Sequence, residues 1–194
     1  MHDKRFPASN ASKLDDPGRN EWLPTAEVLA LLAVRPEEVI ADVGAGTGYF
    51  SLPLAKAAGA VGRVYAVDAQ AEMLLWIKGK LNQGAFTNIE LIHAEAAQTS
   101  LPDSSCDLFF MANIWHEIED QAAVLQESLR VLKPGGRIAI LDWRTDVEAT
   151  YGPPLAHRIS ASNAKMVLDS VGFFQVSLAE VGRYSWLAHG EKRQ

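Results

Sequence analysis

Three glycines alternate with other residues in the run Gly44-Ala45-Gly46-Thr47-Gly48, directly after the short apolar segment Val39–Val43. Glycine has no Cβ, so a backbone of this composition can turn sharply and let a bound molecule lie against it. The same run could also be a tight turn that binds nothing. The spacing favours a ligand site, because a purely structural turn rarely needs three alternate glycines.

An acidic residue, Asp68, ends the next β-branched segment, 20 residues after Gly48. A carboxylate at this place can accept hydrogen bonds from both hydroxyls of a ribose, as in dinucleotide-binding folds. Taken alone, Asp68 could instead cap a helix that begins near Gln70. Together with the glycine run, Asp68 predicts a ligand that contains a nucleoside.

The spacing of the glycines narrows the class of nucleoside ligand. Nicotinamide enzymes use G-x-G-x-x-G, whereas this chain has G-x-G-x-G with Tyr49 where the last glycine would fall. A phosphate-binding lysine loop is excluded too, because no G-K-[ST] sequence follows the glycines. The sequence therefore disfavours both nicotinamide dinucleotides and nucleoside triphosphates as the ligand.

Short apolar segments that alternate with helix-like segments must position these residues. The expected strands cover residues 39–43, 63–68, 89–93, 106–111 and 137–142. Strands separated by helices are typical of βαβ units, whose right-handed crossovers produce a parallel sheet with helices on both faces. Only four residues separate segments 173–178 and 183–189, so these last two strands must form an antiparallel hairpin.

Length and charge limit the function classes. The chain has 194 residues with 18 Lys and Arg against 24 Asp and Glu, a net charge of −6. We expect one domain, residues 23–194, preceded by an N-terminal arm or cap of residues 1–22. An acidic chain lacks the basic face that holds a phosphate backbone, so nucleic acid is not the expected partner. The composition leaves the oligomeric state open.

A single cysteine, Cys106, excludes disulfides and any cysteine-based metal site, and no metal site is predicted. The first residues carry charges but no apolar core of a secretory signal. The longest apolar runs are too short for a membrane span. We therefore expect a soluble, cytoplasmic protein.

Four motifs in the right order resemble those of class I S-adenosylmethionine-dependent methyltransferases. Residues 42–48 resemble the first motif of that family, and Val67-Asp68 followed by Glu72-Met73-Leu74 resembles the second. Residues 101–107 and 132–137 resemble two further stretches. The resemblance covers residues 21–145. It implies a Rossmann-like doubly wound α/β sheet of order 3-2-1-4-5-7-6, with strand 7 antiparallel.

The resemblance also implies the cofactor, S-adenosylmethionine, and its contacts. In the family, the glycine turn approaches the methionine part and the acidic residue after the second strand binds the ribose. Glu95 stands where an aspartate commonly binds the adenine amino group. The implied cofactor-binding residues are Asp42, Gly44, Gly46, Gly48, Asp68, Ala69, Glu95 and Asn113.

The stretch Asn113–Ile118, followed by Asp120, resembles the small-molecule branch of the family, which includes ubiquinone and menaquinone biosynthesis enzymes. The resemblance thus implies transfer of a methyl group to a small-molecule acceptor. A non-catalytic cofactor-binding module and a protein or RNA methyltransferase remain alternatives. A lid formed by residues 144–160, together with the N-terminal arm, would complete the acceptor pocket.

His116 is the candidate catalytic residue. An imidazole, with an ordinary pKa of about 6.5, can take a proton from an acceptor near neutral pH. The alternative is that His116 only packs beneath the lid. The aromatic residues Trp22, Trp115, Trp143 and Tyr151 could line a pocket or belong to the core.

Overall fold

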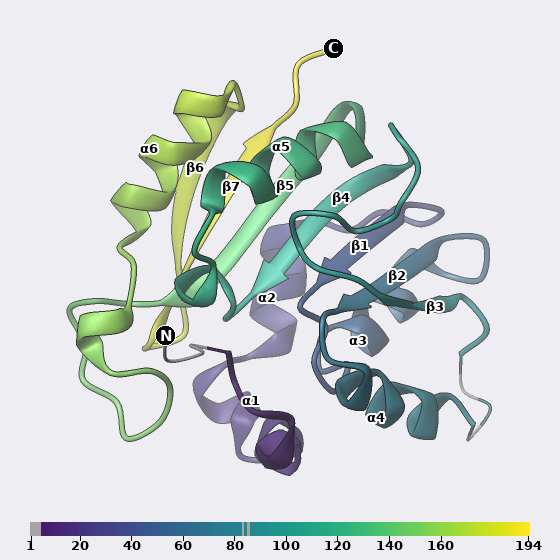
Figure 1. Ribbon diagram of the computed structural model, residues 1–194, viewed down its shortest axis with the longest axis horizontal. Helices are drawn as coiled ribbons and strands as arrows, with labels where there is room; N and C mark the ends of the chain where they lie inside the picture. Colours follow the sequence, from purple (N-terminus) through teal and green to yellow (C-terminus); the bar gives the residue numbers. More distant parts are fainter. Residues whose placement is uncertain (1–4, 83, 85) are drawn as a thin grey trace.

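Seven strands form one twisted sheet in the order β3-β2-β1-β4-β5-β7-β6 (Figure 1). The computed structural model describes residues 5–82, 84 and 86–194. Only β7 runs antiparallel to its neighbours, so the predicted fold class and strand order are confirmed. The strands are β1 (Val39–Val43), β2 (Arg63–Asp68), β3 (Ile89–His93), β4 (Cys106–Ala112), β5 (Leu132–Trp143), β6 (Phe174–Val181) and β7 (Ser185–Glu191).

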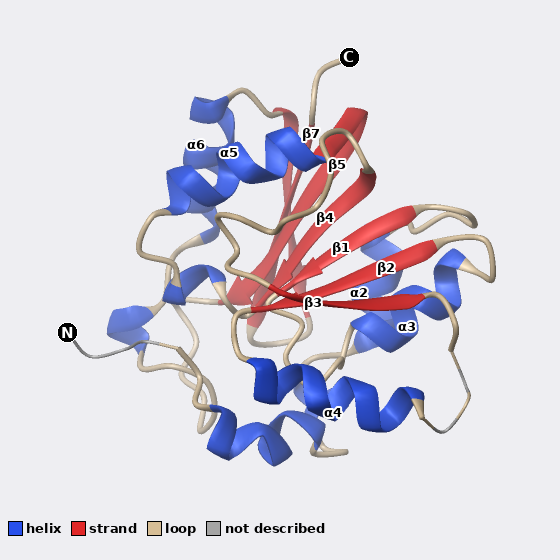
Figure 2. Ribbon diagram, turned by 45° about the vertical axis from the view of Figure 1, so that its right-hand side comes forward, coloured by secondary structure: helices blue, strands red, loops and turns tan. Residues whose placement is uncertain are grey.

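Helices cover both faces of the sheet, as right-handed crossovers require. Figure 2 shows α5 and α6 on one side, and α2, α3 and α4 on the other. Within the described residues, none of the helices combines the length and apolar character needed to cross a membrane. The helices of the domain are α2 (Thr25–Leu32), α3 (Ser51–Ala58), α4 (Ala71–Leu81), α5 (Gln121–Val131) and α6 (Ala161–Val171).

The central strands are buried on both faces, which explains their continuous apolar sequences. Along β4, Phe109 and Met111 pack in the core beneath α5 and α6. Their neighbours Leu108 and Phe110 pack on the opposite face, against α2 and α3. The side-chain period of two along a strand thus divides β4 between two cores.

Expected strand boundaries were wrong in β5 and in the terminal hairpin. β5 begins at Leu132 rather than at residue 137, because Leu132 pairs with Cys106 before an irregularity in the ladder. In the terminal hairpin, β6 continues to Val181 and the turn lies at residues 182–184, not 179–182. Gly182 begins that turn with a left-handed φ of 52°, which a glycine adopts without strain.

The N-terminal segment contains the 3-10 helix η1 (Ala8–Asp15) and the short helix α1 (Arg19–Trp22). Figure 1 shows it in purple, near α4 and the ends of the central strands. η1 packs against α4, and the Asp15 carboxylate pairs with the Lys80 ammonium at 2.8 Å. The domain boundary at residue 22 stays a prediction.

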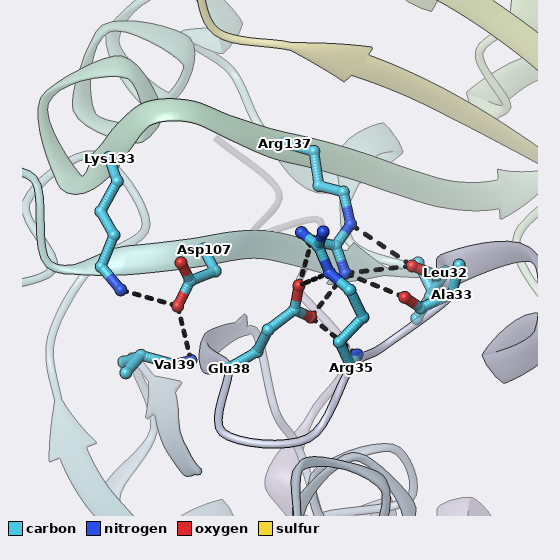
Figure 3. Close-up of polar contacts among 8 residues, drawn as sticks. All are labelled: Leu32, Ala33, Arg35, Glu38, Val39, Asp107, Lys133 and Arg137. Carbon is cyan, nitrogen blue, oxygen red and sulfur yellow. Dashed lines mark hydrogen bonds and ion pairs between the residues drawn. The ribbon is translucent and has the colours of Figure 1, made fainter.

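A buried ion pair joins the start of β1 to β5 at the amino end of the sheet (Figure 3). The Arg137 guanidinium donates to both oxygens of Glu38, at 2.8 and 2.7 Å, and to the Leu32 carbonyl that ends α2. Burial alone would raise the pKa of Glu38, but hydrogen bonds from Arg137 and Arg35 lower it to about 2. The pair therefore stays ionised at neutral pH and anchors α2 on the sheet.

Replacement of Arg137 by methionine should destabilise the fold, because it leaves the Glu38 carboxylate buried with only the exposed Arg35 as a partner. We expect the free energy of unfolding to fall by about 3 kcal/mol, the usual cost of breaking a buried pair. Denaturant unfolding would measure it. Arg63→Met is the matched control, since the Arg63–Glu90 pair is exposed and should contribute less than about 1 kcal/mol. Equal losses in the two variants would contradict this account.

Candidate active site

The predicted site residues meet at one edge of the sheet. Asp42 lies near the end of β1, and the glycine turn follows that strand. Asp68 ends β2, and Glu95 and Asn113 lie just beyond β3 and β4. These strands are neighbours and parallel, so their carboxyl ends point the same way. Ligands of open α/β sheets bind at this edge. The individual roles of these residues stay predictions.

The three glycines of the turn have left-handed φ values of 74°, 55° and 85°. Close packing also requires glycine at two of these three positions. A Cβ on Gly44 would lie 2.7 Å from the Ile114 side chain, and one on Gly48 would lie 2.9 Å from Leu52. Gly46 differs, because a Cβ there would meet only Leu14 of the N-terminal segment, at 3.4 Å. At Gly46 the left-handed backbone, rather than close packing, calls for glycine, and Leu14 of the N-terminal segment lies directly against this face of the turn.

The Asp68 carboxylate ties the end of β2 to the glycine turn. Its Oδ2 accepts a hydrogen bond from the Gly46 amide at 2.8 Å, and its Oδ1 accepts from the Gln70 amide at 2.9 Å. Each carboxylate oxygen can accept a second bond, so both can still receive a ribose hydroxyl. Burial raises the pKa of Asp68, and the two amides oppose that rise. Beside it, the Ala69 carbonyl lies 3.0 Å from His93 Nε2.

Asp42 is a buried carboxyl beneath the turn. The Ser51 hydroxyl donates to its Oδ2 at 2.5 Å. Burial raises the pKa of Asp42, the Ser51 hydrogen bond opposes the rise and the charge of Asp68 adds to it, so that the pKa is about 7. Asp42 therefore carries a proton in a large part of the molecules at neutral pH.

Asn113 has features that fit a ligand beyond the end of β4. Its backbone adopts a left-handed φ of 58°, and its amide donates to the Leu141 carbonyl at 2.8 Å. Its buried Oδ1 has no hydrogen-bond partner among the described residues. An unpaired buried acceptor is costly, and a donor group on a bound molecule would satisfy it. Together with the spare acceptor sites of Asp68, Asn113 fits a hydroxyl- and amine-bearing nucleoside.

His116 forms a buried pair with Asp142, the penultimate residue of β5. His116 Nδ1 lies 2.8 Å from Asp142 Oδ1, and the His116 amide donates to Asp142 Oδ2 at 2.9 Å. The Trp143 amide also donates to Asp142 Oδ1, at 2.7 Å. A proton on Nδ1 leaves the lone pair of the neutral imidazole on Nε2. This arrangement can hold a general base in one orientation.

Nearby charges set the titration of His116. Burial works to lower the pKa of His116, but the hydrogen bond and charge of Asp142, with the charge of Glu117, raise it overall, against the charge of Arg158. Glu117 Oε1 lies 3.8 Å from His116 Nε2. Burial raises the pKa of Glu117 to about 7. An imidazole and a carboxyl, both with raised pKa values, therefore lie side by side.

The N-terminal segment lies over this edge of the sheet. The Phe6 amide donates to Glu117, at 3.1 Å, and the Ala8 amide and the Phe6 carbonyl bond the Gln70 side chain. The Thr47 hydroxyl donates to Asp15 at 2.6 Å. On the outer side, Arg5 pairs with Glu95 at 3.1 Å, where the Glu95 side chain is 61% exposed. The segment thus contacts residues around each part of the predicted cofactor site.

Aromatic side chains gather at the end of β5, around Trp143, the residue that follows Asp142. Trp22 stacks on Trp143 and on Tyr151, with ring centroids 5.1 and 4.8 Å apart. Trp115 instead lies in the core beneath α5. Arg158 donates to three backbone carbonyls, at residues 144, 147 and 153. Arg158 thus holds the segment that carries Tyr151 against the site.

Sequence reasoning did not assign a role to Asp142 or Glu117. Glu117 adjoins His116 in the chain, and that adjacency was a usable signal. Asp142 lies 26 residues further on and reaches His116 only because β4 and β5 pair directly. No local pattern records that contact.

Comparison with known proteins identifies the family of this chain. Residues 41–140 match the methyltransferase-domain family. The chain belongs to this family. The resemblance deduced from the motifs is thereby confirmed. A SAM-dependent methyltransferase from Aquifex aeolicus, known from its crystal structure, is 34% identical to this chain. The match covers 96% of this chain and 99% of the Aquifex chain, with a TM-score of 0.90.

Curated relatives of this methyltransferase-domain protein are longer. The demethylmenaquinone methyltransferase of Listeria welshimeri is 32% identical over 164 residues, 83% of this chain but 65% of that protein. The enzyme of the same name from Bacillus subtilis is 31% identical over 116 residues, half of its length. A Haemonchus contortus phosphoethanolamine N-methyltransferase, 12% identical with a TM-score of 0.72, shares the fold.

Replacement of Asp42 by asparagine should flatten the pH dependence of stability. In the unfolded chain Asp42 ionises near its ordinary pKa of 3.8, so from about pH 4 to 7 the folded state binds more protons. Stability therefore falls as pH rises through about 7. Between pH 5 and 8, the unmodified protein should lose at least about 1 kcal/mol more unfolding free energy than the variant, since each pKa unit corresponds to about 1.4 kcal/mol.

Urea unfolding at the two pH values, without ligand, would measure this difference. Glu117 titrates in the same range but is present in both proteins, so the comparison isolates Asp42. Glu90→Gln, on the exposed side of β3, should leave the pH dependence unchanged. Parallel curves for Asp42→Asn and the unmodified protein would contradict the raised pKa.

Proposed function

We propose that this protein is an S-adenosylmethionine-dependent methyltransferase that acts on a small-molecule acceptor. The observation that carries the proposal is the Asp68 carboxylate, held by the Gly46 and Gln70 amides with acceptor sites to spare at the edge of the turn. The names of the Aquifex and Listeria relatives support the cofactor and the class of acceptor.

The cofactor would extend across the carboxyl ends of β3, β2 and β1. Asp68 would bind the ribose hydroxyls, and Glu95 would reach the adenine amino group from the end of β3. Gly46 would lie against the methionine part, while the unpaired Asn113 oxygen would accept a hydrogen bond from it. The Asp42 carboxyl and the Ala69 carbonyl would contribute from beneath and beside the turn.

When bound, the cofactor supplies a methyl group activated by a sulfonium. The protein's task is then to hold and orient the acceptor, and orientation can contribute roughly 7–11 kcal/mol to lowering the barrier. Trp22, Trp143 and Tyr151 form a stacked cluster at the end of β5, where Trp143 follows Asp142. Their flat apolar faces would suit an aromatic acceptor, and the N-terminal segment would shield the site from water.

His116 would act as the general base. Its Nε2 would take the proton from a hydroxyl or amine of the acceptor as the acceptor atom bonds to the methyl carbon, the methyl–sulfur bond breaks and the thioether product leaves. Asp142 would fix the imidazole orientation and stabilise the imidazolium that results, without itself binding the proton. On a hydroxyl-bearing aromatic ring, loss of that proton makes the oxygen and the ring carbons more nucleophilic. The same base would therefore serve methylation at either position.

Asp68→Ala should weaken cofactor binding by roughly 10- to 100-fold, because hydrogen bonds to a charged group contribute about 1.5–3 kcal/mol. Isothermal titration calorimetry with S-adenosylmethionine would measure the affinity of each folded protein. Glu90→Ala, an exposed carboxylate on β3, is the control and should bind normally. An unmodified protein that does not bind the cofactor would refute the proposed function. Unchanged affinity in Asp68→Ala would refute only the ribose contact.

His116→Ala should leave cofactor affinity within about twofold and lower turnover by roughly 10²- to 10⁴-fold, the usual effect of losing a positioned acid–base group. Transfer of a radiolabelled methyl group to demethylmenaquinone, as its reduced quinol, is the first assay. The rate should rise with pH through a pKa above 6.5, because the base must lose its proton and its environment raises that pKa.

Asp142→Asn removes the charge that raises the His116 pKa, so its rate profile should shift to lower pH with a reduced maximum. Glu117 and Arg158 also face the imidazole and remain unchanged in this variant. Normal turnover in His116→Ala would exclude the base. A protein that binds the cofactor but methylates neither this quinol nor a library of small aromatic acceptors would be a binding module instead.

A further inference from the structure

Arg19, at the start of α1, is a buried cation whose nitrogens are only partly bonded. The residue is 7% exposed, and its Nη1 donates to the Leu14 carbonyl at 2.9 Å. Its buried Nε has no hydrogen-bond partner, and no carboxylate among the described residues forms an ion pair with it. Burial lowers the pKa of Arg19 to about 10, a measure of how unfavourable this position is for the charge.

Two other arginines with little exposure, Arg137 and Arg158, have more hydrogen-bond partners than Arg19. Arg137 is paired with both oxygens of Glu38, and Arg158 donates to three backbone carbonyls. Arg19 instead lies over aromatic rings, with its Cζ 4.2 Å from the Tyr49 centroid and 5.7 Å from that of Trp22. A ring face stabilises the charge but leaves the in-plane N–H groups free for a planar acceptor.

Arg19 also lies beside the glycine turn. Tyr49 directly follows Gly48, and Leu14, which accepts from Arg19, is the side chain that faces Gly46. With the ribose on Asp68 and the adenine toward β3, the substituent on the ribose 5′ carbon must run back along the turn, away from β3. That path leads toward Tyr49 and Arg19.

We propose that Arg19 binds the carboxylate at the methionine end of S-adenosylmethionine. The inference rests on the proposed function, because it takes the cofactor to be the molecule on the turn. A carboxylate would accept from the guanidinium and form the direct ion pair that Arg19 lacks among the described residues, since the nearby Asp15, whose charge acts on Arg19, pairs with Lys80 instead. The N-terminal segment would then contribute a binding residue as well as a cover.

The test compares two ligands that differ by one carboxylate, S-adenosylmethionine and decarboxylated S-adenosylmethionine, by calorimetry. The unmodified protein should bind the first roughly 10- to 100-fold more tightly, as expected for a charge-assisted hydrogen-bonded pair. Arg19→Met should lose that preference. Its affinity for S-adenosylmethionine should fall by about the same factor, while its affinity for the decarboxylated ligand should stay within about threefold.

Arg63→Met, an exposed arginine at the start of β2, should retain the full preference. Arg19→Lys keeps the charge without the planar fork and should retain part of it. Equal losses for both ligands in Arg19→Met, or none for either, would overturn the proposal. If Arg19→Met does not fold, the unmodified protein still decides, since binding both ligands equally overturns the carboxylate contact. Failure to bind either ligand would instead refute the proposed function.

Discussion

The hydrogen bond from the Gly46 amide to the Asp68 carboxylate is the contact on which the site depends. It fastens the loop after β1 to the end of β2, and the Gly44 and Ala45 amides add two bonds to the Val67 carbonyl. The turn is therefore held in a conformation that only glycine adopts without strain. One carboxylate thus shapes the turn and keeps acceptor positions that, in the proposed function, would bind the ribose.

The pairing of β4 with β5 has a similar consequence for the chemistry. It brings Asp142 to the loop that carries His116, where one carboxylate accepts from both the imidazole and the backbone amide of the same residue. A histidine held at two points keeps one orientation, as a general base requires. In the proposed function, cofactor binding and acceptor chemistry would therefore be positioned by different strand pairs of one sheet.

Features with local signatures were predictable from the sequence. The glycine turn after β1 and the acidic residue that ends β2 each depend on residues close together in the chain, and the structure has a turn with left-handed glycines and Asp68 at these places. The parallel sheet followed from the alternation of strands and helices, and its strand order from the family resemblance. The early start of β5 was missed because Pro134 and the two glycines after it are typical of a turn. The pairing of Leu132 with Cys106, which begins the strand, depends on a residue far away in the sequence.

Long-range side-chain contacts could not be predicted in this way. The His116–Asp142 pair depends on which strands are neighbours. The burial of Arg19 depends on how the N-terminal segment folds back over the sheet, and its polar sequence suggested only an arm or cap. Such contacts carry much of the proposed chemistry, although the residue types alone identified the kind of ligand.

A crystal structure of the protein with S-adenosylhomocysteine bound would test the central claim most directly. The account predicts the ribose hydroxyls within hydrogen-bond distance of the Asp68 carboxylate, with the sulfur on the side of the turn that faces His116. A nucleoside bound away from the β1–β2 edge, or a ribose held by side chains other than Asp68, would contradict it.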